Sequence, residues 1–277
     1  MDEVRVASWT ELQEQLFEEA WREDLARHRS NFAFRGRADA AEGLETSLLR
    51  LGGDARTLEG YLVRNFRKYA QDRDLPSDSV WDWLALGQHH GLPTRLLDWT
   101  YSPYVALHFT TANHERFHRD GVVWTIDYVR AREVLPDALR DVLEHEGANV
   151  FTPELLERAA PGLRELDELA SEACCLFLEP PSLDARIVNQ YALFSLLTDP
   201  TVPLDDWLER HPELGRKLVI PADLKWEIRD KLDQANITER VLFPGLDGLT
   251  RWLARYYRPR EGLFPGREPA ASSQRRL

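Results

Sequence analysis

The stretch from Gln88 to Pro103 reads QHHGLPTRLLDWTYSP and holds the densest set of polar and turn-forming residues in the chain. It continues a segment, 79–90, that is predicted to be helical and is followed by a glycine suited to a helix end. Residues 96–100 are predicted to be extended, and a serine followed by proline at 102–103 predicts the start of another helix. A connector needs far fewer hydrogen-bonding side chains, so we also expect a functional site here.

Outward from this stretch, short apolar runs predict strands, and apolar stripes at helical spacing predict helices. The predicted strands are 31–36, 122–126, 174–178, 193–196 and 217–220, and the predicted helices are 8–28, 57–69, 131–145, 153–170, 221–234 and 247–257. The stripes of the first two helices are Leu12, Leu16, Ala20 and Leu25, and Leu58, Leu62, Phe66 and Tyr69. Strand and helix do not alternate as in a doubly wound sheet. The pattern predicts an α+β fold, a single domain with a mixed, mainly antiparallel sheet flanked by helices.

The predicted domain covers residues 1–258, with its core at 30–255. Residues 127–184 carry 14 Asp and Glu against 5 Arg, and we expect an acidic helical insertion at about 127–172 that forms a solvated face or a docking surface for a partner. From 259 to 277 the composition predicts a disordered basic tail.

Composition and charge exclude several classes of protein. The 277 residues include 35 Lys and Arg and 47 Asp and Glu, a net charge of −12 that argues against a general polyanion binder but leaves room for a local basic patch. No apolar run approaches the roughly 20 residues of a membrane span, and the N-terminus lacks a secretory signal pattern. Cys174 and Cys175 are adjacent and have no metal-ligand spacing around them. We therefore expect a reduced, cytoplasmic protein with two buried thiols, no metal and no membrane partner.

Two short motifs could carry chemistry. In Phe34-Arg35-Gly36 the arginine ends a predicted strand, where its planar fork suits phosphate or ribose oxygens and the glycine lets a ligand approach the backbone. The alternative is a surface arginine in a turn. In the longer stretch, His89 and His90 are candidate bases or simple capping residues, and Arg95 and Asp98 could form an internal ion pair. Nucleotide-binding glycine motifs and hydrolase or zinc-protease motifs are missing from the sequence.

Together these motifs resemble the FRG domain family of bacterial proteins. The resemblance rests on FRG at 34–36, WL at 83–84, QHHGLPTRLLDWT at 88–100, SP at 102–103, ALHF at 106–109, Arg186, Asn189-Gln190, Leu193-Phe194, Ile237-Thr238 and LFPGL at 242–246. It spans roughly residues 30–255.

A weaker resemblance, to the ADP-ribosyltransferase pattern, implies an ADP-ribosyltransferase-like core. It assigns the first position to Arg35, the second to Asp98-Trp99-Thr100 with Ser102 and Ala106-Leu107-His108-Phe109, and the third to Gln190. The implied substrate is NAD, without a metal. The implied catalytic residues are Arg35, Thr100, Ser102, Gln190 and His90, and the implied NAD-binding residues are Arg35, Gly36, Arg95, Asp98, Trp99, Thr100 and Tyr104.

The resemblance departs from its strongest form at Gln190, because a neutral amide cannot stabilise the oxocarbenium-like ribose of the transition state. Glu179 or Asp98 would then supply the negative charge, and His89 or His90 would act as the general base. The alternative for Gln190 is a buried amide that satisfies backbone groups.

Three functions stay open at this point. The first is an NAD-dependent ADP-ribosyltransferase, as in a bacterial toxin or phage-defence effector, with a protein or nucleic-acid acceptor and an antitoxin or other partner protein. The second is a non-catalytic module that binds a nucleotide or nucleic acid in the same pocket, aided by residues 251–277 with their seven Arg and two Glu. The third is a nuclease or hydrolase that uses His89, His90 and Asp98.

Overall fold

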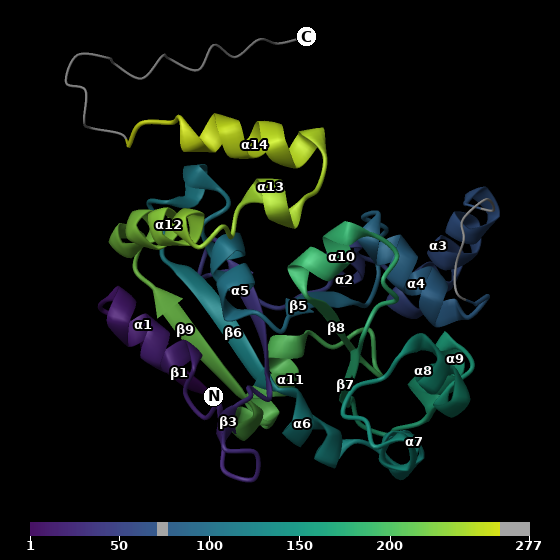
Figure 1. Ribbon diagram of the computed structural model, residues 1–277. Coiled ribbons are helices and arrows are strands. Elements are labelled where there is room, and N and C mark those ends of the chain that lie inside the picture. The colour runs from purple at the N-terminus through teal and green to yellow at the C-terminus, as the bar shows by residue number, and fades with distance from the viewer. Residues whose placement is uncertain (71–76, 261–277) are drawn as a thin grey trace.

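The computed structural model describes residues 1–70 and 77–260, and its centre is a seven-stranded mixed sheet (Figure 1). The strand order is β1-β9-β6-β4-β5-β8-β7, and among these neighbours only β1 and β9 run parallel in the described residues. The strands are β1 (Asp2–Arg5), β4 (Phe32–Arg37), β5 (Leu97–Thr100), β6 (Gly121–Asp127), β7 (Cys175–Leu178), β8 (Ala192–Leu197) and β9 (Gly215–Ile220). The predicted α+β class with a mixed, mainly antiparallel sheet is confirmed. Most of the predicted tail, 261–277, lies outside the described residues.

Helices cover both faces of this sheet (Figure 1). One apolar core joins β4, β6 and β9 to α1 (Trp9–Leu16), α5 (Pro103–Thr110) and α12 (Lys225–Gln234). On the opposite face a second core contains α6 (Tyr128–Ala131) and α11 (Leu204–Arg210). A third packs β7 and β8 against α3 (Ala55–Tyr69), α4 (Val80–His89), α7 (Asp137–Glu146), α8 (Pro153–Ala159) and α9 (Leu163–Glu168). The remaining α-helices are α2 (Ser47–Leu51), α10 (Ala185–Gln190), α13 (Glu239–Leu242) and α14 (Leu246–Tyr256). No helix in the described part of the chain is long and apolar enough to cross a membrane.

The predicted helix 8–28 is wrong in its second half. It begins as expected, with the side chain of Ser8 accepting a hydrogen bond from the Glu11 N–H at 3.2 Å, but it ends at Leu16. A short hairpin follows, β2 (Trp21–Arg22) and β3 (Arg27–His28). Ala26 adopts a left-handed φ of 47°, which a helix does not allow. Leu25, counted as the last apolar position of the stripe, is exposed in the turn.

The two cysteines do not form a disulfide. Cys175 is fully buried in the sheet, and burial raises the pKa of its thiol. Cys174 is only half-buried and donates to the Glu172 carbonyl at 3.4 Å. The expectation of two buried thiols therefore holds for one of them.

A buried polar network fastens α5 to α12 and to the C-terminal helices. Nδ1 of His108 lies 2.9 Å from Nη1 of Arg229, and Nη2 of the same guanidinium donates to Asp233 at 3.1 Å. Arg255 in α14 in turn binds both Asp233 and Glu239. Since an arginine can only donate, Nδ1 of His108 accepts and the ring is neutral. Burial, together with the charge of Arg229, lowers the pKa of His108 to about 3.

This histidine makes the fold sensitive to acid. Between about pH 6.5 and pH 3 the unfolded chain binds a proton at His108 that the folded chain does not, so stability is lost as the pH falls. One proton of difference corresponds to about 1.4 kcal/mol per pH unit. His108→Asn keeps an acceptor near Nδ1 without titrating, and we expect its free energy of unfolding to fall less steeply below pH 6.5. Parallel pH profiles from urea unfolding would contradict this account.

Candidate functional site

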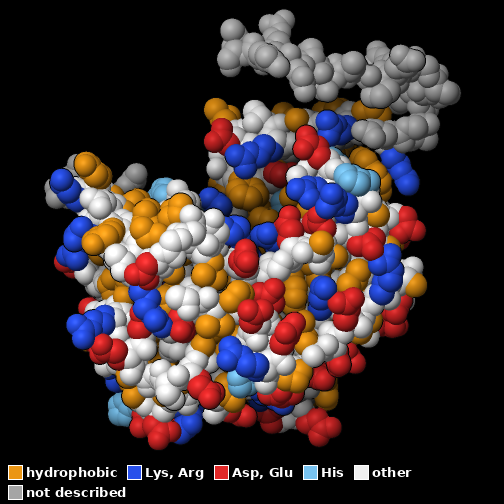
Figure 2. Space-filling model, turned by 180° about the vertical axis from the view of Figure 1, so that it is seen from behind, with side chains coloured by type: hydrophobic (Ala, Val, Ile, Leu, Met, Phe, Trp, Pro, Cys, Tyr) orange, Lys and Arg blue, Asp and Glu red, His pale blue; other side chains and the backbone are white. Residues whose placement is uncertain are grey.

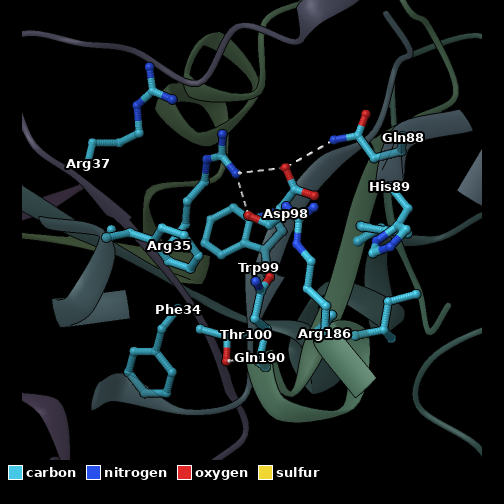
Figure 3. A pocket seen from close by; sticks show the side chains of 15 residues that line it. Phe34, Arg35, Arg37, Gln88, His89, Asp98, Trp99, Thr100, Arg186 and Gln190 are labelled. Atoms are coloured by element: carbon cyan, nitrogen blue, oxygen red, sulfur yellow. Dashed lines mark hydrogen bonds and ion pairs between the residues drawn. The ribbon is translucent and has the colours of Figure 1, made fainter. Parts of the chain in front are cut away.

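A pocket of about 290 Å³ opens where the strands β4 and β5 separate (Figure 3). These neighbours share a single registered pair, Phe34 with Thr100, whereas β4 and β6 share six. The lining comes from five elements and one flanking strand: Phe34, Arg35, Gly36 and Arg37 of β4; Asp98, Trp99 and Thr100 of β5; Gln88 and His89 of α4; Phe109 of α5; Arg186, Ile187 and Gln190 of α10; and Ala192 and Phe194 of β8. Since backbone pairing stops at one residue, side chains fill the gap between the strands.

Arg35 occupies that gap. Continuing the register would place Gly36 opposite Asp98, yet the hydrogen bond to the Asp98 carbonyl comes from the Arg35 guanidinium. The same guanidinium lies 3.7 Å from the Asp98 carboxylate, and the Arg35 side chain is only 12% exposed. Its Nε atom is buried without a partner. Burial lowers the pKa of Arg35 to about 10, so it stays cationic at neutral pH.

Asp98 is the single carboxylate among the described residues that line the pocket. Its side chain is 61% exposed, and Gln88 donates to it from Nε2 at 3.0 Å. Gln88 is itself oriented, because its Oε1 accepts a 2.6 Å hydrogen bond from the buried Thr94 hydroxyl. Figure 3 shows Arg35 and Gln88 converging on the Asp98 carboxylate. The carboxylate is therefore fixed by two neighbours but open to the pocket.

The far wall carries a histidine and a second arginine. Nε2 of His89 lies 2.7 Å from a carboxylate oxygen of Asp184. Partial burial opposes ionisation of Asp184, but hydrogen bonds from the Ile187 N–H and from His89 hold its pKa below the usual range. Arg186 begins α10 beside this pair. Across residues 1–70 and 77–260, no group of three His, Cys, Asp or Glu side chains is placed to hold a metal ion.

Gly36 has a packing role. A Cβ at this position would lie 1.8 Å from the carbonyl oxygen of Ala106 and 2.8 Å from the hydroxyl oxygen of Thr110. The glycine therefore lets α5 lie directly against β4. Close approach of a ligand, the role expected from the sequence, is not what demands a glycine here.

Thr100 and Gln190 join two walls of the pocket. The Thr100 hydroxyl donates to the Gln190 carbonyl at 2.7 Å and accepts from the Ser102 N–H at 3.0 Å. The Gln190 amide donates to the Leu242 carbonyl at 3.0 Å, as the backbone-satisfying alternative predicted. Ser102 does not line the pocket; its hydroxyl caps α5 through the Val105 N–H.

The two aromatic residues assigned to NAD binding, Trp99 and Tyr104, are both engaged in packing. Trp99 reaches the pocket wall, but its indole is buried and donates to the Ser195 hydroxyl at 2.8 Å. Tyr104 lies outside the pocket, with its ring 6.3 Å from that of Trp9 and its hydroxyl bonded to Gln13. The half-buried ring of Phe109 lines the pocket instead.

Arg95 and His90, two further predicted site residues, also lie outside the pocket. Arg95 is fully buried and binds the carboxylates of Glu59 and Asp167 at 2.6 Å each. Its ion pair is therefore with these residues, and not with Asp98. His90 is exposed at the end of α4, while its neighbour His89 faces the pocket. Glu179, a candidate for the missing acid, does not line the pocket either and lies near Tyr101.

Comparison with known families agrees with the sequence motifs. Residues 30–119 match the model of the FRG domain. The match covers 90 of the 277 residues. The matched segment supplies β4, α4, β5 and α5, and thus Arg35, Gln88, His89 and Asp98. Among curated proteins and solved structures no match to the chain was found.

The pocket also contains residues that the sequence analysis did not assign to the site. Arg37 follows Arg35 by two positions, the spacing that brings side chains to the same face of a strand, and this signal was available. Gln88 stood in the quoted motif without a role. Arg186, from outside the matched segment, could be placed only once α10 was seen to cover the sheet.

Proposed function

We propose that the pocket binds NAD and that the FRG domain is an ADP-ribosyltransferase-like enzyme with a macromolecular acceptor. The observation that supports this most is the pairing of a nearly buried arginine with an open carboxylate at the gap between two strands. Such a site offers a cation for phosphate oxygens and an anion for a developing positive charge. The activity would suit a bacterial toxin or a phage-defence effector.

NAD binding would use the cations of the pocket. Arg35 and Arg37 lie on β4, and Arg186 approaches from α10. Among the described residues, the Nε atoms of Arg35 and Arg37 are buried without a partner, so each guanidinium keeps donor capacity that a pyrophosphate could satisfy once the side chain turns toward it. A volume of about 290 Å³ stands at the lower end for ligand sites and suits one half of the dinucleotide, with the other half at the mouth.

In the proposed reaction the bond between ribose C1′ and the nicotinamide nitrogen breaks, and its electron pair leaves with nicotinamide. The ribose then carries positive charge, which the Asp98 carboxylate would stabilise. A nucleophilic oxygen or nitrogen of the acceptor forms the new bond to C1′ and releases a proton. We assign His89, which lines the pocket and is oriented by Asp184, as the base that accepts this proton.

Two variants test the assignment of roles. Arg35→Ala removes a charged hydrogen-bond donor, which is typically equivalent to about 10- to 100-fold in affinity, so calorimetry should show weaker NAD binding. Asp98→Asn keeps the shape of the carboxylate, and we expect it to retain NAD binding but to lose nicotinamide release by about 100-fold or more. Arg5→Ala, which removes an exposed arginine paired with Asp120, is the matched control. Unchanged NAD affinity in Arg35→Ala would refute the binding role of this residue.

A non-catalytic nucleotide-binding module is the second candidate. It is favoured by the engagement of the Gln190 amide with the backbone and by the ion pair that Asp98 already makes with Arg35. An assay that measures both NAD binding and nicotinamide release in the presence of candidate acceptors distinguishes the enzyme from the binding module. NAD binding without nicotinamide release by the unaltered protein would identify the module.

A further inference from the structure

Two arginines share one phenyl ring beside the mouth of the pocket. The guanidinium of Arg186 lies 5.2 Å from the ring centre of Phe243, and that of Arg251 lies 5.6 Å from the same centre. Phe243 also contacts Phe109, with ring centres 6.3 Å apart, and Phe109 and Arg186 line the pocket. We call Arg186, Phe243 and Arg251 the rim; it is continuous with the pocket.

The charges of the rim are not neutralised by the protein. Within the described residues, neither Arg186 nor Arg251 has a carboxylate within ion-pair distance, although most of the pocket's own charges are paired. Both arginines are exposed. Stacking on an aromatic ring leaves the guanidinium N–H groups free to bind an anion.

The same combination of arginine and aromatic ring recurs next to the rim. Arg240 lies 4.7 Å from the ring centre of Trp252, which follows Arg251 in α14. Tyr256 and Tyr257 are exposed at the end of that helix, 55% and 77% respectively. Residues 235–260 carry five Arg against two acids, a net of +3 in a chain of net −12. Figure 2 shows Lys and Arg side chains gathered in the hollow between α3–α4 and α13–α14.

We propose that the rim and the adjoining surface of α13 and α14 bind a single nucleic-acid strand and lead it to the pocket. Exposed arginines would contact the phosphates, and the exposed rings of Tyr256 and Tyr257 would stack with unpaired bases. That this strand is the acceptor of ADP-ribose rests on the proposed function, whereas its binding does not.

The observations favour a single strand over other anions. The bases of a duplex are stacked on each other and are not available to aromatic side chains, whereas unpaired bases are. An acidic peptide would neutralise the arginines but would leave the exposed rings of Tyr256 and Tyr257 unused. The acidic bulk of the chain would repel a nucleic acid elsewhere and confine it to this region.

The experiment measures the binding of fluorescently labelled oligonucleotides of about 12 residues, single-stranded DNA, single-stranded RNA and a DNA duplex, to the full chain. The test variant is Arg240→Gln with Arg251→Gln, which lie outside the pocket lining. The control is Arg27→Gln with Arg64→Gln, because both are exposed, neither has a carboxylate partner among the described residues, and Arg64 stacks on Tyr61 at 5.0 Å. We expect the test variant to weaken single-strand binding about 10-fold and to reduce the salt slope by about 1.4, with the control unchanged.

Comparison of single-stranded DNA with single-stranded RNA shows which of the two the protein prefers, and either preference supports the proposal. Equal binding of the duplex, equal losses in the test and control variants, or no binding at low salt would overturn it. Stronger binding of a poly-glutamate peptide through Arg251 would assign the surface to an acidic protein and overturn it as well. NAD affinity of the test variant should stay unchanged. Strand binding without NAD consumption would refute the proposed enzyme alone, and NAD consumption without strand binding would refute this surface alone.

Discussion

Gly36→Ala is expected to destabilise the protein by at least about 3 kcal/mol, or to prevent folding. The added methyl group would lie 1.8 Å from the Ala106 carbonyl oxygen and 2.8 Å from its carbonyl carbon, and neither atom can move without displacing α5. Since α5 carries both Phe109 and His108, its displacement would also deform the pocket wall and the buried network. Urea unfolding followed by circular dichroism measures the loss.

Gly60→Ala provides the matched control. This glycine lies in α3 with nothing within 4 Å of an added Cβ, and it is exposed. Alanine at such a helical position is expected to stabilise the protein by about 0.5–1 kcal/mol. If the two variants unfold with similar free energies, close packing of α5 is not the reason for the glycine at position 36.

Arg95→Met is expected to cost about 3–5 kcal/mol, because it leaves a buried carboxylate without a counter-charge. Glu59 is fully buried, receives the Arg95 side chain at 2.6 Å and also accepts from the Arg95 N–H at 2.9 Å. Asp167 would keep a partner, since Arg56 lies 3.4 Å from it. The loss therefore falls mainly on Glu59, and urea unfolding near neutral pH measures it.

The second variant of this pair is designed to recover stability. Glu59→Leu combined with Arg95→Met removes both charges, and such replacements are often close to neutral. We expect the double variant to regain most of the loss. A double variant as unstable as Arg95→Met alone would mean that the arginine is needed for packing and not to neutralise Glu59. Arg140→Met, at a surface pair with Asp137, should change stability by less than about 1 kcal/mol.

The same ion pair shows where local pattern stops being informative. Apolar spacing in residues 57–69 predicted a buried face ending at Tyr69, yet Tyr69 is exposed and the buried residues are Ala55, Glu59 and Val63. A glutamate enters the core only because Arg95 meets it there, 36 positions along the chain. Sequence periodicity contains no information about that partner.

One strand of the sheet could not be predicted from local sequence, because it is extended only through pairing with a distant segment. The central strands β4, β5, β6, β8 and β9 are apolar enough to be predicted from local pattern. β1 reads DEVR, is mostly exposed, and is extended because it pairs with β9, more than 200 residues away. Short helices such as α10 and α13 were missed for a related reason, since they are held by tertiary contacts such as the bond from Gln190 to Leu242.

For the pocket, the motifs located the right region but not the role of each residue within it. Arg35, Asp98 and Thr100 come together because β4 and β5 are neighbours, and Gln190 joins them because α10 ends there and leads into β8, which pairs with β5. Arg95 stood three positions from Asp98 in the same motif and serves the core instead. A conspicuous motif can therefore combine ligand-facing and structural residues, and only burial and partners separate them.

The place of Arg35 links ligand binding to the mechanics of the sheet. On one side stand β1, β9, β6 and β4, on the other β5, β8 and β7, and the seam between them has one registered backbone pair plus the Arg35 guanidinium on the Asp98 carbonyl. An anion that draws this guanidinium away breaks the hydrogen bond between Arg35 and the Asp98 carbonyl, and with it one contact between β4 and β5. An anion that binds both Arg35 and the opposite wall of the pocket adds a contact between them. The occupant of the pocket is therefore expected to change how strongly β4 is held to β5, while the apolar core shared by both sets of strands stays in place.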